Sequence, residues 1–164
     1  MLLLPEDTLV IFCDLHQSLI NQSKTISPDS LARNNGILAE LCLHFKLTSC
    51  ILKVPVSSGP TGVIKSIQPL QTKTNTLYRL DANPYKEVTL TEYLARTSAT
   101  KVVNSGFPTE IGAMFTAPGA LRQGVRVIIA DECNGCRSSI TARAAISYTA
   151  SIVQQHLQPS PIAV

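Results

Sequence analysis

The chain has 164 residues, of which 45% are hydrophobic and 15% charged, and its formal net charge at pH 7 is +3. This size and composition suit one folded domain over residues 1–164 and argue against a disordered chain. The basic residues are scattered and only 5% of residues are aromatic, so nucleic-acid binding is not expected.

The start of the chain and its hydropathy indicate an intracellular protein, in the cytoplasm or an organelle. The apolar run Met1–Leu4 has no basic residues before it and stops at Pro5, which is unlike a signal peptide. No segment approaches the roughly 20 apolar residues of a membrane span, so no membrane partner is expected. Five cysteines without a secretory signal fit a reducing compartment.

The first half of the chain predicts two buried strands separated by a helix. Leu9–Cys13 is apolar on both faces, as in a parallel strand. Ser27 suits the N-cap of a helix over Pro28–Phe45, with proline at the first helical position. Ser49–Val54 predicts the second strand. Pro55–Lys73, rich in Ser, Gly, Pro and Thr, predicts a loop with little regular structure.

The second half continues the alternation of strands and helices. It predicts strands at Thr76–Leu80, Lys101–Asn104 and Val125–Ala130, and helices at Leu90–Ala95, Thr109–Gly124 (kinked near Pro118) and Ser138–His156. Such alternation predicts an open, doubly wound parallel sheet covered by helices on both faces. The expected fold class is therefore α/β, a three-layer α/β/α arrangement that is Rossmann-like.

Three segments carry a resemblance to a known family. They read LVIFCDLHQSL, VVNSGFPTEIGAMFTAPGALRQG and VRVIIADECNG. In order and spacing they resemble the isochorismatase-like (cysteine hydrolase) superfamily, and within it the small isochorismatase domain-containing proteins. The resemblance implies a parallel-sheet α/β fold, a homo-oligomer, and hydrolysis by an Asp, a Lys and a Cys with backbone N–H groups as the oxyanion hole. No cofactor is expected.

Carried over to this chain, the family's catalytic positions are only partly kept. The acid falls on Asp14, the Lys on Arg79 and the nucleophilic Cys on Gly112, which has no side-chain atom for a covalent intermediate. The family's cis peptide falls on the Phe107–Pro108 bond. Its upstream oxyanion N–H falls on Pro108, which has none, and one lost donor costs about 10²–10³ in rate.

Isochorismatases proper work without the Cys, because an Asp acts as the acid on a vinyl ether. Asp14 follows an apolar strand, where burial raises a carboxyl pKa, and Arg79 stays protonated and suits an anionic small molecule. The sequence therefore favours an unconventional hydrolase that depends on Asp14. The alternative is a catalytically inactive member that acts as a ligand-binding or oligomeric scaffold, with Asp14 only capping a neighbouring turn.

Four further residues are candidates for substrate binding: His16, Phe107, Pro108 and Thr109. His16 either faces the same pocket as Asp14 or is a surface-loop histidine. Gly112, expected at the third position of its helix, either leaves its N–H unpaired for a ligand or is a tolerated small residue. No metal site is expected, because His44 and His156 fall on predicted helices away from Asp14 and His16.

The cysteines do not suggest a replacement nucleophile. Cys13, Cys42 and Cys50 fall in apolar patterns and are expected to be core residues, with Cys13 on the opposite side of its strand from Asp14. Cys133 and Cys136 have a CxxC spacing, but no second CxxC and no thioredoxin-like context. A polar turn that contains two thiols is the favoured interpretation.

Overall fold

A five-stranded parallel sheet organises the protein. The computed structural model describes residues 5–55 and 62–139, and every structural statement below concerns these residues. The strand order is β3-β2-β1-β4-β5, and every pair of neighbours is parallel. The strands are β1 (Thr8–Cys13), β2 (Thr48–Lys53), β3 (Thr76–Tyr78), β4 (Lys101–Gly106) and β5 (Arg126–Asn134). The predicted doubly wound sheet is confirmed.

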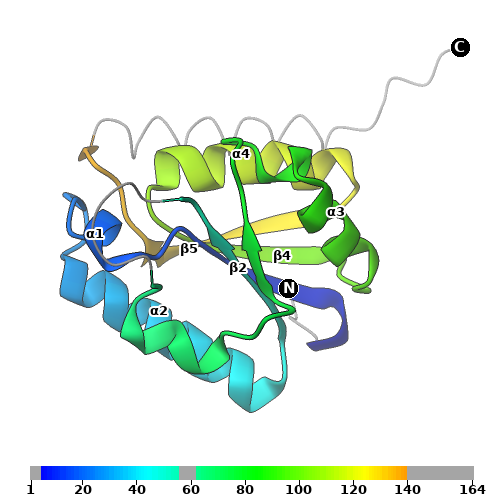
Figure 1. Ribbon diagram of the computed structural model, residues 1–164, viewed down its shortest axis with the longest axis horizontal. Coiled ribbons are helices and arrows are strands. Elements are labelled where there is room, and N and C mark those ends of the chain that lie inside the picture. Colours follow the sequence, from blue (N-terminus) through cyan, green and yellow to red (C-terminus); the bar gives the residue numbers. More distant parts are fainter. Residues whose placement is uncertain (1–4, 56–61, 140–164) are drawn as a thin grey trace, which may run out of the picture.

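Helices cover both faces of this sheet, which gives the three predicted layers (Figure 1). Helix α2 lies on one face, and helices α3 and α4 lie on the other. The α-helices are α1 (Gln17–Ile20), α2 (Pro28–Phe45), α3 (Val88–Ala95) and α4 (Thr109–Arg122). Three short 3₁₀ helices are η1 (Pro5–Asp7), η2 (Lys65–Leu70) and η3 (Pro84–Lys86). No described helix is both long enough and apolar enough to cross a membrane.

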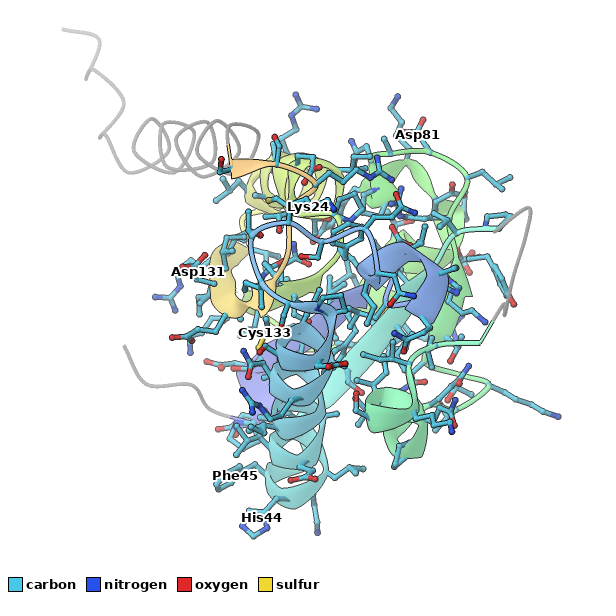
Figure 2. All side chains as sticks on the ribbon, turned by 90° about the vertical axis from the view of Figure 1, so that its left-hand side faces the viewer. Lys24, His44, Phe45, Asp81, Asp131 and Cys133 are labelled. Carbon is cyan, nitrogen blue, oxygen red and sulfur yellow. The ribbon has the colours of Figure 1, made fainter. Side chains whose placement is uncertain are left out.

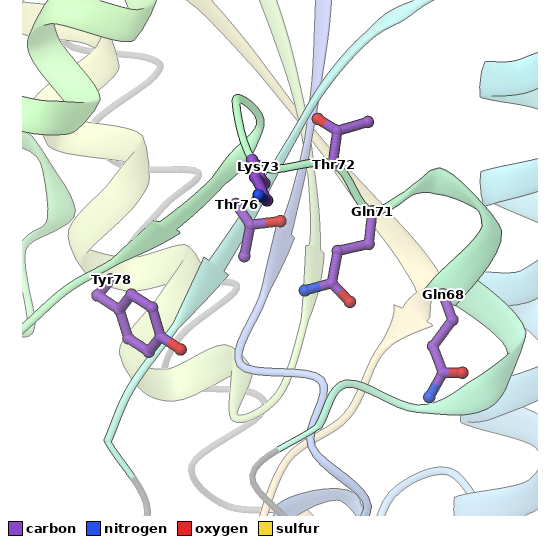
Figure 3. A pocket seen from close by; sticks show the side chains of 6 residues that line it. All are labelled: Gln68, Gln71, Thr72, Lys73, Thr76 and Tyr78. Atoms are coloured by element: carbon purple, nitrogen blue, oxygen red, sulfur yellow. The ribbon is translucent and has the colours of Figure 1, made fainter.

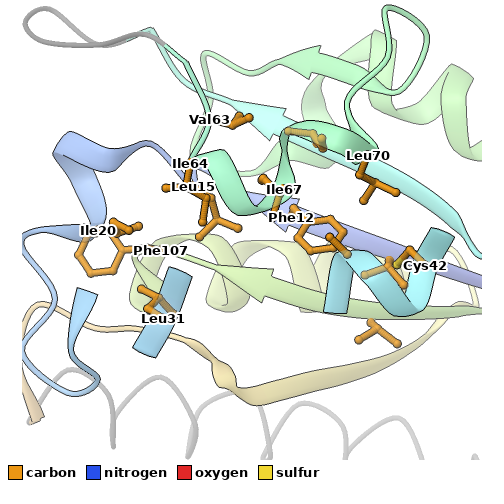
Figure 4. Packing of buried hydrophobic residues seen from close by; sticks show 14 residues of the cluster. Phe12, Leu15, Ile20, Leu31, Cys42, Val63, Ile64, Ile67, Leu70 and Phe107 are labelled. Atoms are coloured by element: carbon orange, nitrogen blue, oxygen red, sulfur yellow. The ribbon is translucent and has the colours of Figure 1, made fainter. Parts of the chain in front are cut away.

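Alternation along β1 divides the core into two clusters, one on each face of the sheet. All six residues of β1 are buried, as expected for a central parallel strand. Val10 and Phe12 pack on the α2 side together with Ile67 and Phe107 (Figure 4). Leu9, Ile11 and Cys13 pack on the opposite side against residues of α3 such as Leu90. Core packing on both faces therefore holds β1 in place up to Cys13, the residue before Asp14.

Helix α2 begins and ends where its sequence dictates. The Ser27 side chain accepts a hydrogen bond of 3.2 Å from the Ser30 N–H, and Pro28 occupies the first helical position. The helix ends at Phe45, and Lys46 follows in the left-handed conformation with φ 54°. The predicted bounds of this helix are confirmed.

One prediction needs correction, and another concerns residues outside the described ranges. The loop expected over Pro55–Lys73 contains η2, because Ile67 and Leu70 recur at a helical spacing and bury against the α2 side of the core. The predicted helix over Ser138–His156 lies outside the described residues from 140 onward. Helix α4 runs through Pro118 to Arg122, within the expected bounds of Thr109–Gly124.

Candidate functional site

The candidate site lies where the strand order reverses. β1 pairs with β2 on one side and with β4 on the other, so the carboxyl end of β1 is the switch point at which open α/β sheets hold ligands. Asp14 follows β1 directly and is 1% exposed. Its φ of 52° lies in the left-handed region, which Asp tolerates better than most residues. Its N–H donates to the Leu52 carbonyl at 2.9 Å, which fixes the backbone at this point.

Arg79 reaches Asp14 from the edge of the sheet. Arg79 follows β3, two strands away from β1, and its N–H donates to the Lys53 carbonyl at 2.8 Å. Its guanidinium Nη2 donates to Asp14 Oδ2 in a direct ion pair, and its Nη1 donates to the Asp81 carbonyl at 2.8 Å. The pair is buried, with side chains 6% and 1% exposed. The family resemblance predicts both residues in one site, and the structure shows that they contact each other.

The two oxygens of Asp14 have different surroundings. Oδ2 accepts from Arg79, whereas Oδ1 is buried and has no hydrogen-bond partner among the described residues. Burial raises the pKa of the Asp14 carboxyl above its ordinary value, and the neighbouring Arg79 guanidinium opposes this rise. The carboxyl group is therefore oriented through one oxygen and can carry a proton on the other.

His16 lies next to Asp14 in the interior. Its backbone N–H donates to the Asp14 carbonyl at 2.8 Å. Its backbone also forms an isolated antiparallel β-bridge with Val63. The side chain is 0% exposed. The alternative of a surface-loop histidine is therefore wrong, because the segment at Val63 crosses over this point. His44 lies at the C-terminal end of α2, next to Phe45 (Figure 2).

The turn between β4 and α4 packs against the end of β1. The predicted cis peptide Phe107–Pro108 is confirmed. The Phe107 N–H donates to the Cys13 carbonyl at 3.0 Å, so the turn sits beside the residue before Asp14. Gly106 is required here: its φ is 139°, and a Cβ would lie 2.1 Å from the Cys13 carbonyl oxygen.

The side chains of this turn contact protein groups. Thr109 donates from its N–H and its hydroxyl to the Gly135 carbonyl, each at 2.9 Å. Phe107 is 0% exposed, and the Arg137 guanidinium lies 6.0 Å from the centre of its ring. Pro108 is the N-cap of α4 and makes no side-chain capping bond. The contacts of Phe107 and Thr109 therefore tie the turn to the core and to the loop after β5.

Gly112 lies in the first turn of α4, but not at the expected position. With Pro108 as N-cap and Thr109 as the first residue, Gly112 is the fourth residue of the helix and not the third. The unpaired N–H groups at a helix start are those of the N-cap and the first three residues. The N–H of Gly112 therefore falls just beyond this set. The expectation that a third helical position leaves this N–H unpaired is wrong.

Comparison with known proteins identifies the architecture. No family model and no curated protein matches the sequence. Among solved structures, YcaC from Pseudomonas aeruginosa superposes with a TM-score of 0.81 at 20% identity, over 91% of this chain and 74% of that one. YcaC from Escherichia coli, described as an octameric hydrolase of unknown specificity, gives 0.81 at 21% identity over 91% and 74%. An isochorismatase from Pseudomonas putida gives 0.75 at 15% identity over 92% and 86%.

The chain has the isochorismatase-like fold. The structural superposition establishes this fold. Because the sequence identities are only 15–21%, the activity has to be argued from the site.

The cysteines are mostly buried and offer no clear nucleophile beside Asp14. All five cysteines are free. Cys13, Cys42 and Cys50 are buried core residues, as predicted, and Cys13 Sγ donates to Asn104 Oδ1 at 3.4 Å. Burial raises the pKa of Cys13 to about 12, so its thiol stays protonated at neutral pH. Cys133 is half-buried near α2, whereas Cys136 is buried.

Two polar residues near the carboxyl ends of the strands were missed from sequence. Asn104 is 0% exposed in β4, and its Nδ2 has no hydrogen-bond partner among the described residues. Lys53 ends β2 and is 7% exposed. The available signal was a polar residue inside or at the end of an apolar strand. Within the described ranges, no three His, Cys, Asp or Glu side chains gather in a group that could hold a metal ion.

Proposed function

We propose that this chain is a thiol-independent hydrolase of the isochorismatase-like fold, with Asp14 as the acid and Arg79 as the residue that orients a small anionic substrate. The observation that carries the proposal is the asymmetry of the Asp14 carboxyl group. Arg79 holds Oδ2, while Oδ1 is buried and free among the described residues. Burial also raises the pKa of this carboxyl, as a general acid requires.

This arrangement suits hydrolysis of an enol ether. A proton passes from Asp14 Oδ1 to the vinyl carbon, and the substrate becomes an oxocarbenium ion. Water adds to that ion, a proton returns to Asp14, and the resulting hemiketal breaks into a ketone and an alcohol. These reaction steps need no nucleophilic side chain, which agrees with glycine at position 112. His16 and the turn at Pro108 would border the substrate.

Acyl transfer by the superfamily's usual route fits this chain poorly. Gly112 offers no thiol, and Pro108 offers no N–H at the upstream oxyanion position. Thr109, the next residue, directs both its N–H and its hydroxyl to the Gly135 carbonyl. An amide substrate would therefore lack both the nucleophile and a main stabilising donor.

A second candidate function is an inactive scaffold that binds a ligand or assembles into a homo-oligomer. The closed ion pair favours it, because Asp14 and Arg79 already pair with each other and are only 1% and 5% exposed, which leaves little access for a substrate. The octameric state of Escherichia coli YcaC supports the homo-oligomer. An intracellular location also remains a prediction.

Product formation separates the two candidates. Isochorismate and a panel of simple amides are incubated with the wild type and with Asp14→Asn, with Asp29→Asn on the exposed start of α2 as a matched control. The proposal expects isochorismate turnover that is lost in Asp14→Asn and kept in Asp29→Asn, with circular dichroism showing that both variants are folded at the assay temperature. A scaffold would give no product with either substrate class, but thermal stabilisation by a small carboxylate.

A further inference from the structure

A hollow lies between η2 and the edge strand β3, apart from Asp14. The hollow is shallow and open to solvent, and its volume is about 470 Å³, enough for one small molecule to rest on it. Six residues line the hollow (Figure 3). Thr76 and Tyr78 come from β3, and η2 and the turn after it supply Gln68, Gln71, Thr72 and Lys73. None of these residues belongs to the Asp14–Arg79 pair.

The lining carries hydrogen-bonding groups and one positive charge, and it contains no carboxylate. Lys73 makes no ion pair within the described part of the chain. The Gln71 side-chain amide lies between Tyr78 and Gln68 and has no hydrogen-bond partner among the described residues. Gln68 donates from Nε2 to the Val63 carbonyl at 3.1 Å, which fixes its amide and leaves Oε1 as an acceptor.

Tyr78 supplies a flat apolar surface at the edge of the hollow. The side chain is 60% exposed, and the Lys53 ammonium lies 5.2 Å from the centre of its ring. Lys53 pairs with Tyr78 in the register of β2 and β3, and it makes no ion pair within the described residues. The ring therefore has one stabilising contact on the protein side and remains exposed toward the hollow.

We propose that this hollow is a second ligand site, for a polyhydroxylated anion of sugar-phosphate size. Lys73 matches the anionic group, because an ammonium pairs with phosphate or carboxylate oxygens. The amides of Gln68 and Gln71 match ligand hydroxyls, and so does the acceptor side of the Thr76 hydroxyl, which donates to Asn75 Oδ1 at 3.4 Å. The Thr72 hydroxyl already accepts from the Asn75 N–H and lies against the Thr74 hydroxyl, each at 3.1 Å, so it borders the ligand without being needed to bind it. The exposed ring of Tyr78 matches the apolar C–H face of a sugar ring. The site does not depend on the hydrolase proposal.

Calorimetric titration with glucose 6-phosphate tests the site. Lys73→Gln removes the cation in the hollow, and Lys65→Gln removes an exposed cation outside it, so the two variants change the net charge equally. We expect Lys73→Gln to weaken binding about tenfold and Lys65→Gln to change it less than twofold. Gln71→Ala should weaken binding several-fold, with exposed Gln123→Ala as its control. Asp14→Asn should leave binding unchanged.

Several results would overturn the proposal. Absence of binding by glucose 6-phosphate at millimolar concentration is one, and equal losses in Lys73→Gln and Lys65→Gln are another, because they indicate general charge attraction. Inorganic phosphate binding as tightly as glucose 6-phosphate would refute the role of the hydroxyl-binding groups. Circular dichroism of each variant shows that the fold is intact.

Discussion

Breaking the Asp14–Arg79 ion pair should destabilise the protein strongly. Asp14→Asn leaves the Arg79 guanidinium buried at 5% exposure without its carboxylate, and arginine cannot neutralise itself by losing a proton. Removing one partner of a buried pair costs about 3–5 kcal/mol of unfolding free energy. For a chain of this size each kcal/mol shifts Tm by about 2–4 °C, so a fall of about 6–20 °C is expected.

The partner variant Arg79→Met should behave differently with pH. It leaves the Asp14 carboxyl, which can neutralise itself by binding a proton. Burial raises the pKa of Asp14 in the folded state, and loss of the guanidinium raises that pKa further. The folded protein then holds the proton more tightly than the unfolded chain, so the stabilisation is present at low pH and is lost as pH rises through the folded pKa. Asp14→Asn should show no such fall.

Urea denaturation of both variants and of the double variant Asp14→Asn/Arg79→Met, each at pH 5 and pH 8, measures these effects. We expect the double variant to be more stable than the sum of the single losses predicts, by about 2 kcal/mol or more, because it leaves no unpaired buried charge. Single losses below about 1 kcal/mol, or purely additive losses, would refute the reasoning and mean that the pair is solvated in solution.

Three further predictions concern the turn, a helix cap and the thiols. Gly106→Ala should cost about 3 kcal/mol or more in urea denaturation, because its Cβ would meet the Cys13 carbonyl oxygen at 2.1 Å; Gly124→Ala meets nothing within 4 Å and should cost only about 1–2 kcal/mol. Similar costs would contradict the tight turn. Ser27→Ala should cost about 1 kcal/mol through the lost cap of α2, and an unchanged midpoint would disprove that contribution. Iodoacetamide should modify half-buried Cys133 before fully buried Cys13, because the Cys13 thiol is the less accessible; burial raises both pKa values, to about 11 for Cys133 and about 12 for Cys13. Mass spectrometry of peptides would show the reverse order if Cys13 were accessible.

The fold could be predicted because its signals are local and agree with one another. The apolar run at Leu9–Cys13 and the Ser27-Pro28 helix start each indicate one element, and both are confirmed. The helix η2 was missed because six residues with an internal proline give a weak periodic signal within a segment rich in turn formers. Its two buried apolar residues become informative only once α2 lies beside it.

The proximity of Asp14 and Arg79 was predictable because chain order determines where these two residues lie. Asp14 follows the central strand and Arg79 follows β3, so a parallel sheet brings both to its carboxyl edge. The sequence does not determine which polar side chains face the interior. Lys53 and Asn104 were missed because burial of their side chains depends on the elements packed over each face. The burial of His16 likewise depends on a segment almost fifty residues later in the chain.

The most direct test of the proposed chemistry is isochorismate turnover after alkylation of the accessible thiols of the folded protein, measured for the wild type and for Asp14→Asn. The account predicts that alkylated wild type keeps its turnover, because no thiol takes part, and that Asp14→Asn loses it. Turnover that alkylation abolishes, or that persists in Asp14→Asn, would contradict an Asp14-dependent hydrolase. Absence of product from untreated wild type would contradict the proposed reaction and favour the scaffold.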